Sequence, residues 1–175
     1  RHAVVGDASL GTEAACARCH EFDFPEPQEA LMQGTIAEHA SSRNAAAPCR
    51  DCHMPLMAGE GLSTHRSHDF RVIGNAPLLR SALTARAARS AEDPDTVVVT
   101  LAVDRIGHAF PTGDMFRRLE VRGRTEGGEG SAPLAAPPVV LARTFLRVPG
   151  PKGALRRQTG DDRLPSSGAP VEVEL

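Results

Sequence analysis

The sequence lacks tryptophan and tyrosine, and its six phenylalanines make up an aromatic content of only 3%. Large aromatic side chains usually supply much of the apolar volume of a protein core. A chain of this composition therefore has few large apolar side chains with which to build a hydrophobic core. Lysine is nearly absent as well, since Lys152 is the single lysine among 20 basic residues. No apolar run reaches the roughly 20 residues of a transmembrane helix, so no transmembrane segment is expected.

A strong charge of either sign is also absent. The formal net charge is −2 and the isoelectric point is near 6.4, so nothing indicates a nucleic-acid partner or an anionic membrane surface. No signal peptide is visible, and the chain opens with Arg1 rather than methionine. It is therefore expected to be a processed product or part of a longer chain.

Cysteine occurs only four times, but all four copies fall into two identical patterns. These are Cys16-Ala-Arg-Cys19-His20 and Cys49-Arg-Asp-Cys52-His53, each of the form C-x-x-C-H. This pattern is the attachment sequence of a c-type haem. Two thiols three residues apart on one turn can form thioethers with both vinyl groups of one porphyrin. The next residue then places an imidazole under the iron. The sequence thus predicts two haem c groups, with thioethers at Cys16, Cys19, Cys49 and Cys52 and proximal iron ligands at His20 and His53.

Three other readings of the cysteines remain open. The two pairs could form a four-thiolate zinc site, although their separation exceeds the usual 15–20 residues. Two short disulfides or a thioredoxin-like redox pair are further options. None of these explains a histidine directly after both pairs. Two haems would also provide apolar volume, and arginine forks suit the haem propionates. A coding bias toward Ala, Arg, Gly and Pro explains the composition equally well.

Each low-spin haem needs a sixth ligand from outside its own motif. The candidates, in falling order of expectation, are His108, His68, His65, His39 and His2. A short helix that carries the first motif is predicted from Thr12 to His20. A second helix is predicted from Pro27 to about Ser42, and His39 shares its apolar face with Met32 and Ile36. His39 is therefore either a hydrogen-bonded core residue or a haem ligand. Met54 directly follows a proximal histidine and is poorly placed to reach the opposite face of the same ring.

The segment from about residue 38 to 70 contains C-x-x-C-H-M-P, a short loop and a histidine. It resembles the pentahaem cytochrome c nitrite reductases and related multihaem c-type cytochromes. In that family the histidine after the loop serves an earlier haem, and the CHMP haem takes its distal ligand from far downstream. The resemblance implies His68 or His65 on the first haem and His108 on the second. The lysine-bearing CxxCK motif of the nitrite-reducing haem does not occur here.

The second half of the chain reads as short strands. Residues 79–89 contain strong helix formers, but the alternation at 83–87 suits a strand, and a hairpin of this segment with residues 96–103 is predicted. Further strands are predicted at 116–124, 139–148, 155–159 and 171–175. Residues 127–138 read as a loop. Between the strands, residues 107–113 form the sequence Gly-His-Ala-Phe-Pro-Thr-Gly around His108. This loop resembles the G-H-x-x-P-T-G loop of the C-terminal β-sandwich of certain bacterial multihaem cytochromes. In them it points at the haem domain, and residues 161–165 resemble a later loop of the same family.

The fold class expected from these observations is α+β. A mainly helical and irregular dihaem cytochrome c domain, residues 1–77, is followed by a small antiparallel β-sandwich domain, residues 78–175. The predicted function is electron transfer through two bis-histidine haems, as a relay or as part of a longer multihaem chain, rather than enzymatic catalysis. A haem-based oxidoreductase of small nitrogen or sulfur species, or a structural docking subunit, is the alternative.

Partners and location follow from the motif alone. The expected partners are redox proteins or further haem-bearing subunits, in a homo- or hetero-oligomer, and His2 and His39 are candidates to reach a haem outside the chain. Haem c is normally attached outside the cytoplasm, so a periplasmic or extracellular location is predicted.

Overall fold

The computed structural model describes residues 6–24, 31–61, 63–70, 72–125, 135–151 and 153–175. Helices are few and short in this part of the chain: η1 (Ala8–Gly11, a 3-10 helix), α1 (Glu13–His20), α2 (Thr35–Ala40), α3 (Cys49–His53) and α4 (Ala76–Ser81). The strands are β1 (Glu21–Asp23), β2 (Leu31–Gly34), β3 (Leu56–Ala58), β4 (Thr64–Arg66), β5 (Leu83–Arg89), β6 (Val97–Val103), β7 (Arg118–Val121), β8 (Val139–Gly150), β9 (Gly153–Asp161) and β10 (Val171–Glu174).

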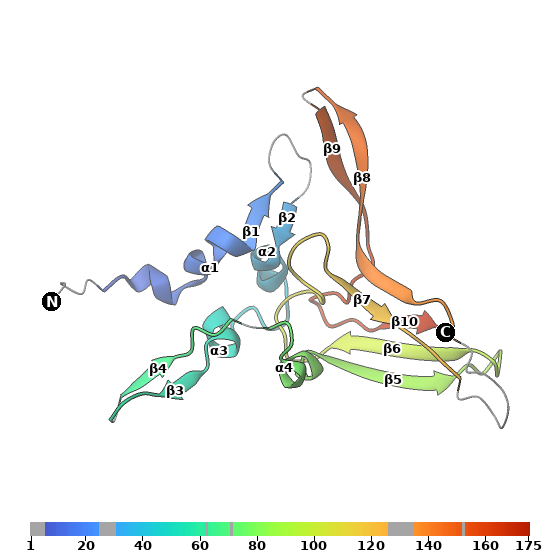
Figure 1. Ribbon diagram of the computed structural model, residues 1–175, viewed down its shortest axis with the longest axis horizontal. Coiled ribbons are helices and arrows are strands. Elements are labelled where there is room, and N and C mark those ends of the chain that lie inside the picture. Colours follow the sequence, from blue (N-terminus) through green and yellow to red (C-terminus); the bar gives the residue numbers. More distant parts are fainter. Residues whose placement is uncertain (1–5, 25–30, 62, 71, 126–134, 152) are drawn as a thin grey trace.

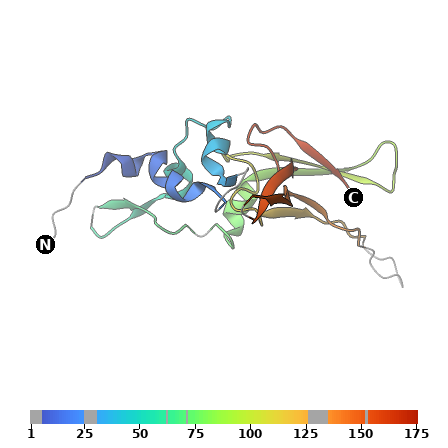
Figure 2. The same ribbon diagram turned by 90° about the horizontal axis from the view of Figure 1, so that it is seen from above.

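These strands form four small antiparallel sheets. Two are ribbons of two strands, β1-β2 and β3-β4, and two have three strands, in the orders β10-β6-β5 and β7-β8-β9. Figure 1 shows β3-β4, β5-β6 and β8-β9 pointing in different directions away from the region around α2. Seen from above, the molecule is elongated, with the N-terminus at one end (Figure 2). Among the described helices, none combines the length and the apolar character needed to cross a membrane.

The predicted fold class is wrong. The N-terminal half is not mainly helical, because its described residues form two β-ribbons beside three very short α-helices. Nor do the later strands build a β-sandwich. β7 pairs with the first part of β8, whereas β9 pairs with its second part, residues 143–150. The second part leaves the body as a two-stranded arm (Figure 1).

The long helix predicted from Pro27 to about Ser42 is also wrong. Residues 25–30 lie outside the described part, residues 31–34 form β2, and only Thr35–Ala40 are helical. The physical reason lies at Gly34, which precedes the helix and is a poor helix former. Glu21 of β1 then caps the helix. Its carboxylate accepts hydrogen bonds from the backbone N–H groups of Ile36 and Ala37, at 3.1 and 3.2 Å.

Other local predictions are confirmed. The helix expected to carry the first cysteine pair is α1, and the expected hairpin is β5-β6, paired from Leu83↔Val103 to Arg89↔Val97. The strands expected at 139–148, 155–159 and 171–175 correspond to β8, β9 and β10. The strand expected at 116–124 is shorter, since β7 spans only Arg118–Val121. The predicted loop at 127–138 lies largely outside the described residues.

The hydrophobic core belongs to the second half of the chain. It consists of Leu101, Val103, Leu141, Leu164 and Val173, contributed by β6, β8, β10 and the loop before β10. Among the described residues before Ala82, Phe24 is the only buried hydrophobic side chain. Large apolar side chains of the first half are exposed instead: Leu10, Phe22, Leu56, Met57, Phe70 and Ile73. The first half therefore has almost no protein core of its own.

Leu164 should be the most sensitive position of this core, because its side chain is 0% exposed. We expect Leu164→Ala to lower the free energy of unfolding by about 2–5 kcal/mol, through lost burial and the cavity left behind. Leu146→Ala is the control, since Leu146 is 56% exposed, and a surface change of this kind costs at most about 0.5 kcal/mol. Denaturant titration measures both values. Equal stability of the two variants would contradict this account of the core.

Candidate functional site

The two C-x-x-C-H motifs occupy two short helices, α1 and α3 (Figure 1). All four cysteines are free thiols, with Cys19 and Cys52 exposed and Cys16 and Cys49 half-buried. Burial raises the pKa of the Cys49 thiol, and the neighbouring Cys16 and Glu13 raise it further. The fold thus brings the first cysteine of one motif beside the first cysteine of the other.

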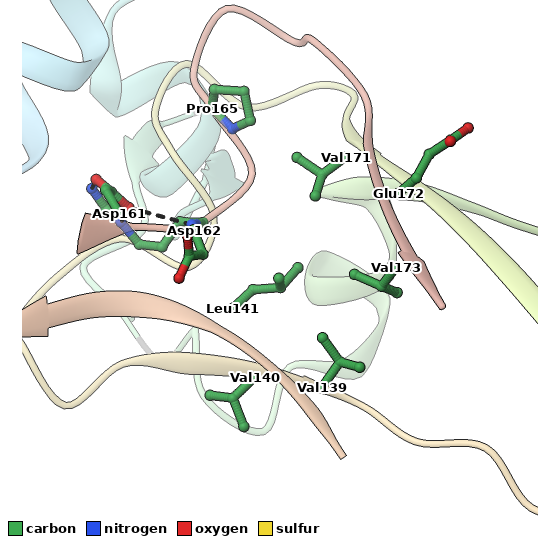
Figure 3. A pocket seen from close by; sticks show the side chains of 10 residues that line it. Val139, Val140, Leu141, Asp161, Asp162, Pro165, Val171, Glu172 and Val173 are labelled. Atoms are coloured by element: carbon green, nitrogen blue, oxygen red, sulfur yellow. Dashed lines mark hydrogen bonds and ion pairs between the residues drawn. The ribbon is translucent and has the colours of Figure 1, made fainter. Parts of the chain in front are cut away.

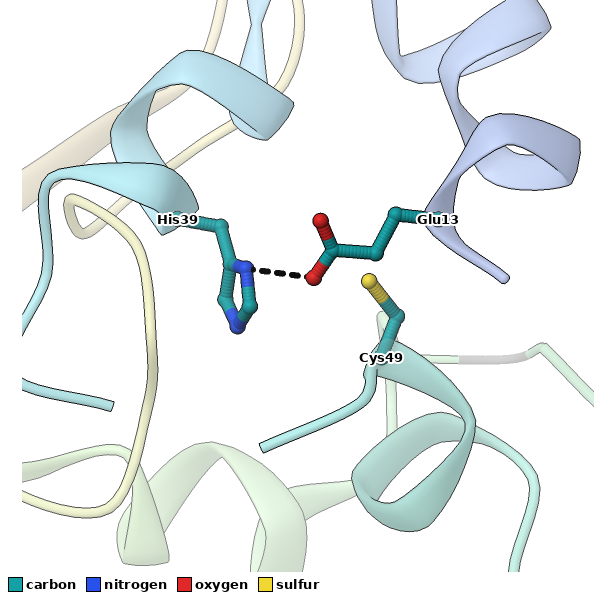
Figure 4. Close-up of side chains that lie close together, drawn as sticks. All are labelled: Glu13, His39 and Cys49. Carbon is teal, nitrogen blue, oxygen red and sulfur yellow. Dashed lines mark ion pairs between the residues drawn. The ribbon is translucent and has the colours of Figure 1, made fainter. Parts of the chain in front are cut away.

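The four thiols do not meet at a common point. Among the described residues, the one group of three or more metal-binding side chains is Glu13, His39 and Cys49, whose ligand atoms all lie within 4.8 Å of one another (Figure 4). The Nδ1 atom of His39 lies 2.9 Å from Glu13 Oε1, close enough for an ion pair but not aligned as a hydrogen bond. A four-cysteine zinc site is therefore not formed.

The imidazole of His53, which follows the second cysteine pair, lies next to that of His108. Their ring centroids are 6.3 Å apart, and the ring planes differ by 22°. An imidazole nitrogen binds a transition metal at about 2 Å, so a shared metal sets the two nitrogens about 4 Å and the ring centroids about 6 Å apart. The observed centroid distance is close to this value, so His53 and His108 are a pair of side chains that could hold one metal between them.

A hydrogen bond fixes the tautomer of His108 that can bind a metal through Nε2. Its Nδ1 lies 3.0 Å from the carbonyl oxygen of Ala109, so Nδ1–H donates and Nε2 keeps a free lone pair. Burial lowers the pKa of His108. It also lowers the pKa of His53, and the neighbouring His108 and His20 lower it further. Both rings are thus favoured in the neutral form, which is the form that binds a metal.

The backbone around His108 is held by residues from both halves of the chain. We call residues 107–113 the His108 loop. At its centre, Phe110 and Leu164 exchange two backbone hydrogen bonds of 2.9 and 3.0 Å. Asn44 donates to the carbonyl of Ile106 at 2.9 Å, just before the loop. At the other end, Arg143 donates to the carbonyl of Gly113 at 3.0 Å and also to that of Met32.

A group of charged side chains around the buried Arg163 lies against the same loop. Arg163 is 6% exposed and donates from Nε and Nη2 to both oxygens of Asp161, at 2.8 and 2.7 Å. Its Nη1 lies 2.8 Å from Glu38 Oε1 and donates to the carbonyl of Pro111 at 3.2 Å. Thr112 donates to Glu38 Oε2 at 2.6 Å. Burial alone would lower the pKa of Arg163, but Asp161 and Glu38 hold it above its ordinary value.

The remaining predicted ligands are placed differently. His20, the histidine of the first motif, is exposed, and its Nδ1 lies 2.7 Å from the Gln33 side-chain amide. His65 on β4 and His68 are exposed, and His68 meets the edge of Phe70 at 6.4 Å between ring centroids. His39 is buried, 7% exposed. His2 lies outside the described residues. Of the distal candidates, His108 is thus the one beside His53.

Sequence reasoning missed Glu38, Thr112 and Gln33. Glu38 and Arg163 are 125 positions apart, and no local pattern pairs a helical glutamate with an arginine in a distant loop. The available signal was the Asp-Asp-Arg sequence at residues 161–163, which was noted only as part of a resemblance.

A cavity of about 610 Å³ lies between β8 and β10 (Figure 3). Its apolar wall includes Val139, Leu141 and Val173, and carboxylates of Asp162 and Glu172 also line it. None of the cysteines or histidines discussed above lines this cavity, but Asp161 and Arg163 do, so it adjoins the charged group that lies against the His108 loop.

The chain matches no protein-family model, no curated protein and no solved structure. The function therefore has to be argued from these residues and their geometry.

Gly107 gives a test of how closely the loop packs. A Cβ atom at this position would lie 2.6 Å from His39 Cδ2 and 3.0 Å from His39 Nε2. We expect Gly107→Ala to lower the free energy of unfolding by about 1–3 kcal/mol through overpacking. Gly6→Ala is the control, because no atom lies within 4 Å of a Cβ there. Denaturant titration compares the two, and unchanged stability of Gly107→Ala would show that His39 does not pack on the loop.

Proposed function

We propose that this chain is a c-type cytochrome that binds two haems covalently and transfers electrons between redox partners. The observation that supports this most strongly is the placement of His108. A histidine 55 positions away in the sequence lies beside the histidine of a haem-attachment motif, at 6.3 Å between centroids and with nearly parallel rings.

The residues needed to hold each haem are available. Cys49 and Cys52 would form the thioethers of the second haem, with His53 and His108 as axial ligands. Cys16, Cys19 and His20 would hold the first haem, and the family resemblance proposes His68 or His65 as its distal ligand. When bound, haem iron supplies one-electron redox chemistry. Here His53 and His108 would hold the iron of the second haem, and two imidazole ligands would favour a lower reduction potential than one imidazole and one thioether.

The distribution of apolar side chains supports the same proposal. The first half of the chain has a single buried hydrophobic residue among those described, yet exposes Leu56, Met57, Phe70 and Ile73. A porphyrin is a large apolar plate, and contact with such side chains is stabilised by the hydrophobic effect. Cys16 and Cys49 also lie close to each other, so haems attached to the two motifs would be near enough to exchange electrons.

The attachment chemistry extends the proposal to location and partners. Haem c is normally attached outside the cytoplasm, so we propose a periplasmic or extracellular location. The partners would be redox proteins or further haem-bearing subunits. A metal ion at Glu13, His39 and Cys49 is the second candidate, on the strength of their mutual distances within 4.8 Å. It leaves three of the four cysteines and both motif histidines without a role.

The first test is the mass of the protein. The denatured chain should be heavier than its sequence mass by two haems, because thioether bonds survive denaturation. Replacing Cys16 and Cys19 together with alanine should remove one haem, and the matched pair Cys49 and Cys52 the other. Mass spectrometry and the Soret band provide the measurement. An unmodified mass with bound zinc would contradict the proposal and favour the second candidate.

The second test asks whether His108 is a ligand of the second haem. His108→Met should keep the second haem covalently bound but raise its reduction potential, because a thioether stabilises ferrous iron relative to imidazole. His108→Gly should open a position that added imidazole fills, as followed by visible spectroscopy. His65→Met is the control and should leave the second haem unchanged. If both His108 variants keep the wild-type spectrum and potential, another residue is the ligand.

A further inference from the structure

We propose that Glu38, Thr112 and the buried Arg163 form a clamp that would set the orientation of the His108 imidazole as an iron ligand. They would be positioning residues, because none of them is a ligand. The inference rests on the proposed function and adds to it the elements that orient the distal ligand.

The clamp contacts the His108 loop at two consecutive residues. Arg163 donates to the carbonyl of Pro111 at 3.2 Å, and Glu38 accepts from the hydroxyl of Thr112 at 2.6 Å. The Thr112 hydroxyl also lies 2.9 Å from that of Thr35. Since Thr112 donates to Glu38, Thr35 donates to Thr112. Helix α2 therefore holds the loop through two side chains one turn apart, Thr35 and Glu38.

The clamp is rigid because each of its charges is paired. The Arg163 guanidinium is engaged on three sides, by Asp161 in a bidentate pair, by Glu38 and by Pro111. Planar forks of this kind fix direction as well as distance. Glu38 is 16% exposed, so this part of the site is largely shielded from water. Such an ion pair is weak evidence for stability by itself, and a role in specifying one arrangement is its better-attested use.

The clamp would restrain the His108 imidazole through the backbone of the His108 loop. His108 lies three residues before Pro111, and its Nδ1–H donates to the carbonyl of Ala109 within the same loop. Fixing the loop thereby fixes the plane of the ring, which lies 22° from the plane of His53.

Two variants separate orientation from charge. Thr112→Val has a similar shape but removes the hydroxyl that joins α2 to the loop, and it changes no charge. Glu38→Gln removes a negative charge near the iron, which favours the ferrous form. Thr112→Ser restores the hydroxyl. Glu120→Gln is the control, since Glu120 also pairs with an arginine, Arg118, at 2.7 Å, but on β7 and with that arginine 62% exposed.

The measurements are the haem content, the low-spin electron paramagnetic resonance spectrum and the reduction potential of each haem in the purified protein. The resonance of a bis-imidazole haem depends on the angle between its ring planes. We expect Thr112→Val to shift or broaden the signal of the His53/His108 haem without the potential shift seen in Glu38→Gln. Glu38→Gln should raise that haem's potential. Thr112→Ser should restore the wild-type signal, and the other haem serves as an internal reference.

Wild-type resonance and potential in both Thr112→Val and Glu38→Gln would overturn the clamp while leaving the proposed function intact. A wild-type protein without haem would overturn the proposed function and the clamp with it. Should Glu38→Gln fail to fold, the contrast between Thr112→Val and Thr112→Ser decides.

Discussion

The candidate site depends on one contact between side chains, that of the His53 imidazole with the His108 imidazole. One imidazole comes from a short helix in a half of the chain that has almost no core. The other comes from the His108 loop. This loop is anchored to the core of the second half, because the backbone of Phe110 is hydrogen-bonded to that of Leu164, whose side chain is fully buried. In the proposed function both residues would hold the same haem iron, which would connect the half with almost no hydrophobic core to the half that contains it.

The contacts between the two halves include several hydrogen bonds and ion pairs beside the edge-to-face packing of Phe24 on Phe145, whose ring centroids are 5.6 Å apart. Arg43 donates to the carbonyls of Val103 and Asp104 at 2.6 and 2.7 Å, and Glu38 pairs with Arg163. These hydrogen bonds and ion pairs are directional, so they specify one relative position of loop and helix. An interface of this kind contributes less hydrophobic stabilisation than a packed core, but it suits a site in which the angle and distance of a ligand matter.

Local sequence patterns predicted part of the secondary structure and one residue of the candidate site. A run of β-branched residues predicted β6, alternation of side chains predicted β5 and β7, and the first C-x-x-C-H motif lies on the short helix expected there, α1. The helix expected around residues 27–42 failed because Glu21, in another element, caps the chain only at Ile36, and residues 31–34 pair with β1 instead. The Glu38–Arg163 pair could not be predicted, since its members meet only through tertiary folding. His108 stood out because glycines and a proline surround it.

The most direct test of the central claim is crystallographic. Diffraction data collected on both sides of the iron absorption edge would locate each iron by its anomalous difference peak. The account predicts one peak between the imidazoles of His53 and His108, on the line joining their ring nitrogens, and a second beside His20. A peak on His53 with water or another residue opposite it would contradict the account. So would a crystal without iron that shows a zinc edge and a peak among Glu13, His39 and Cys49.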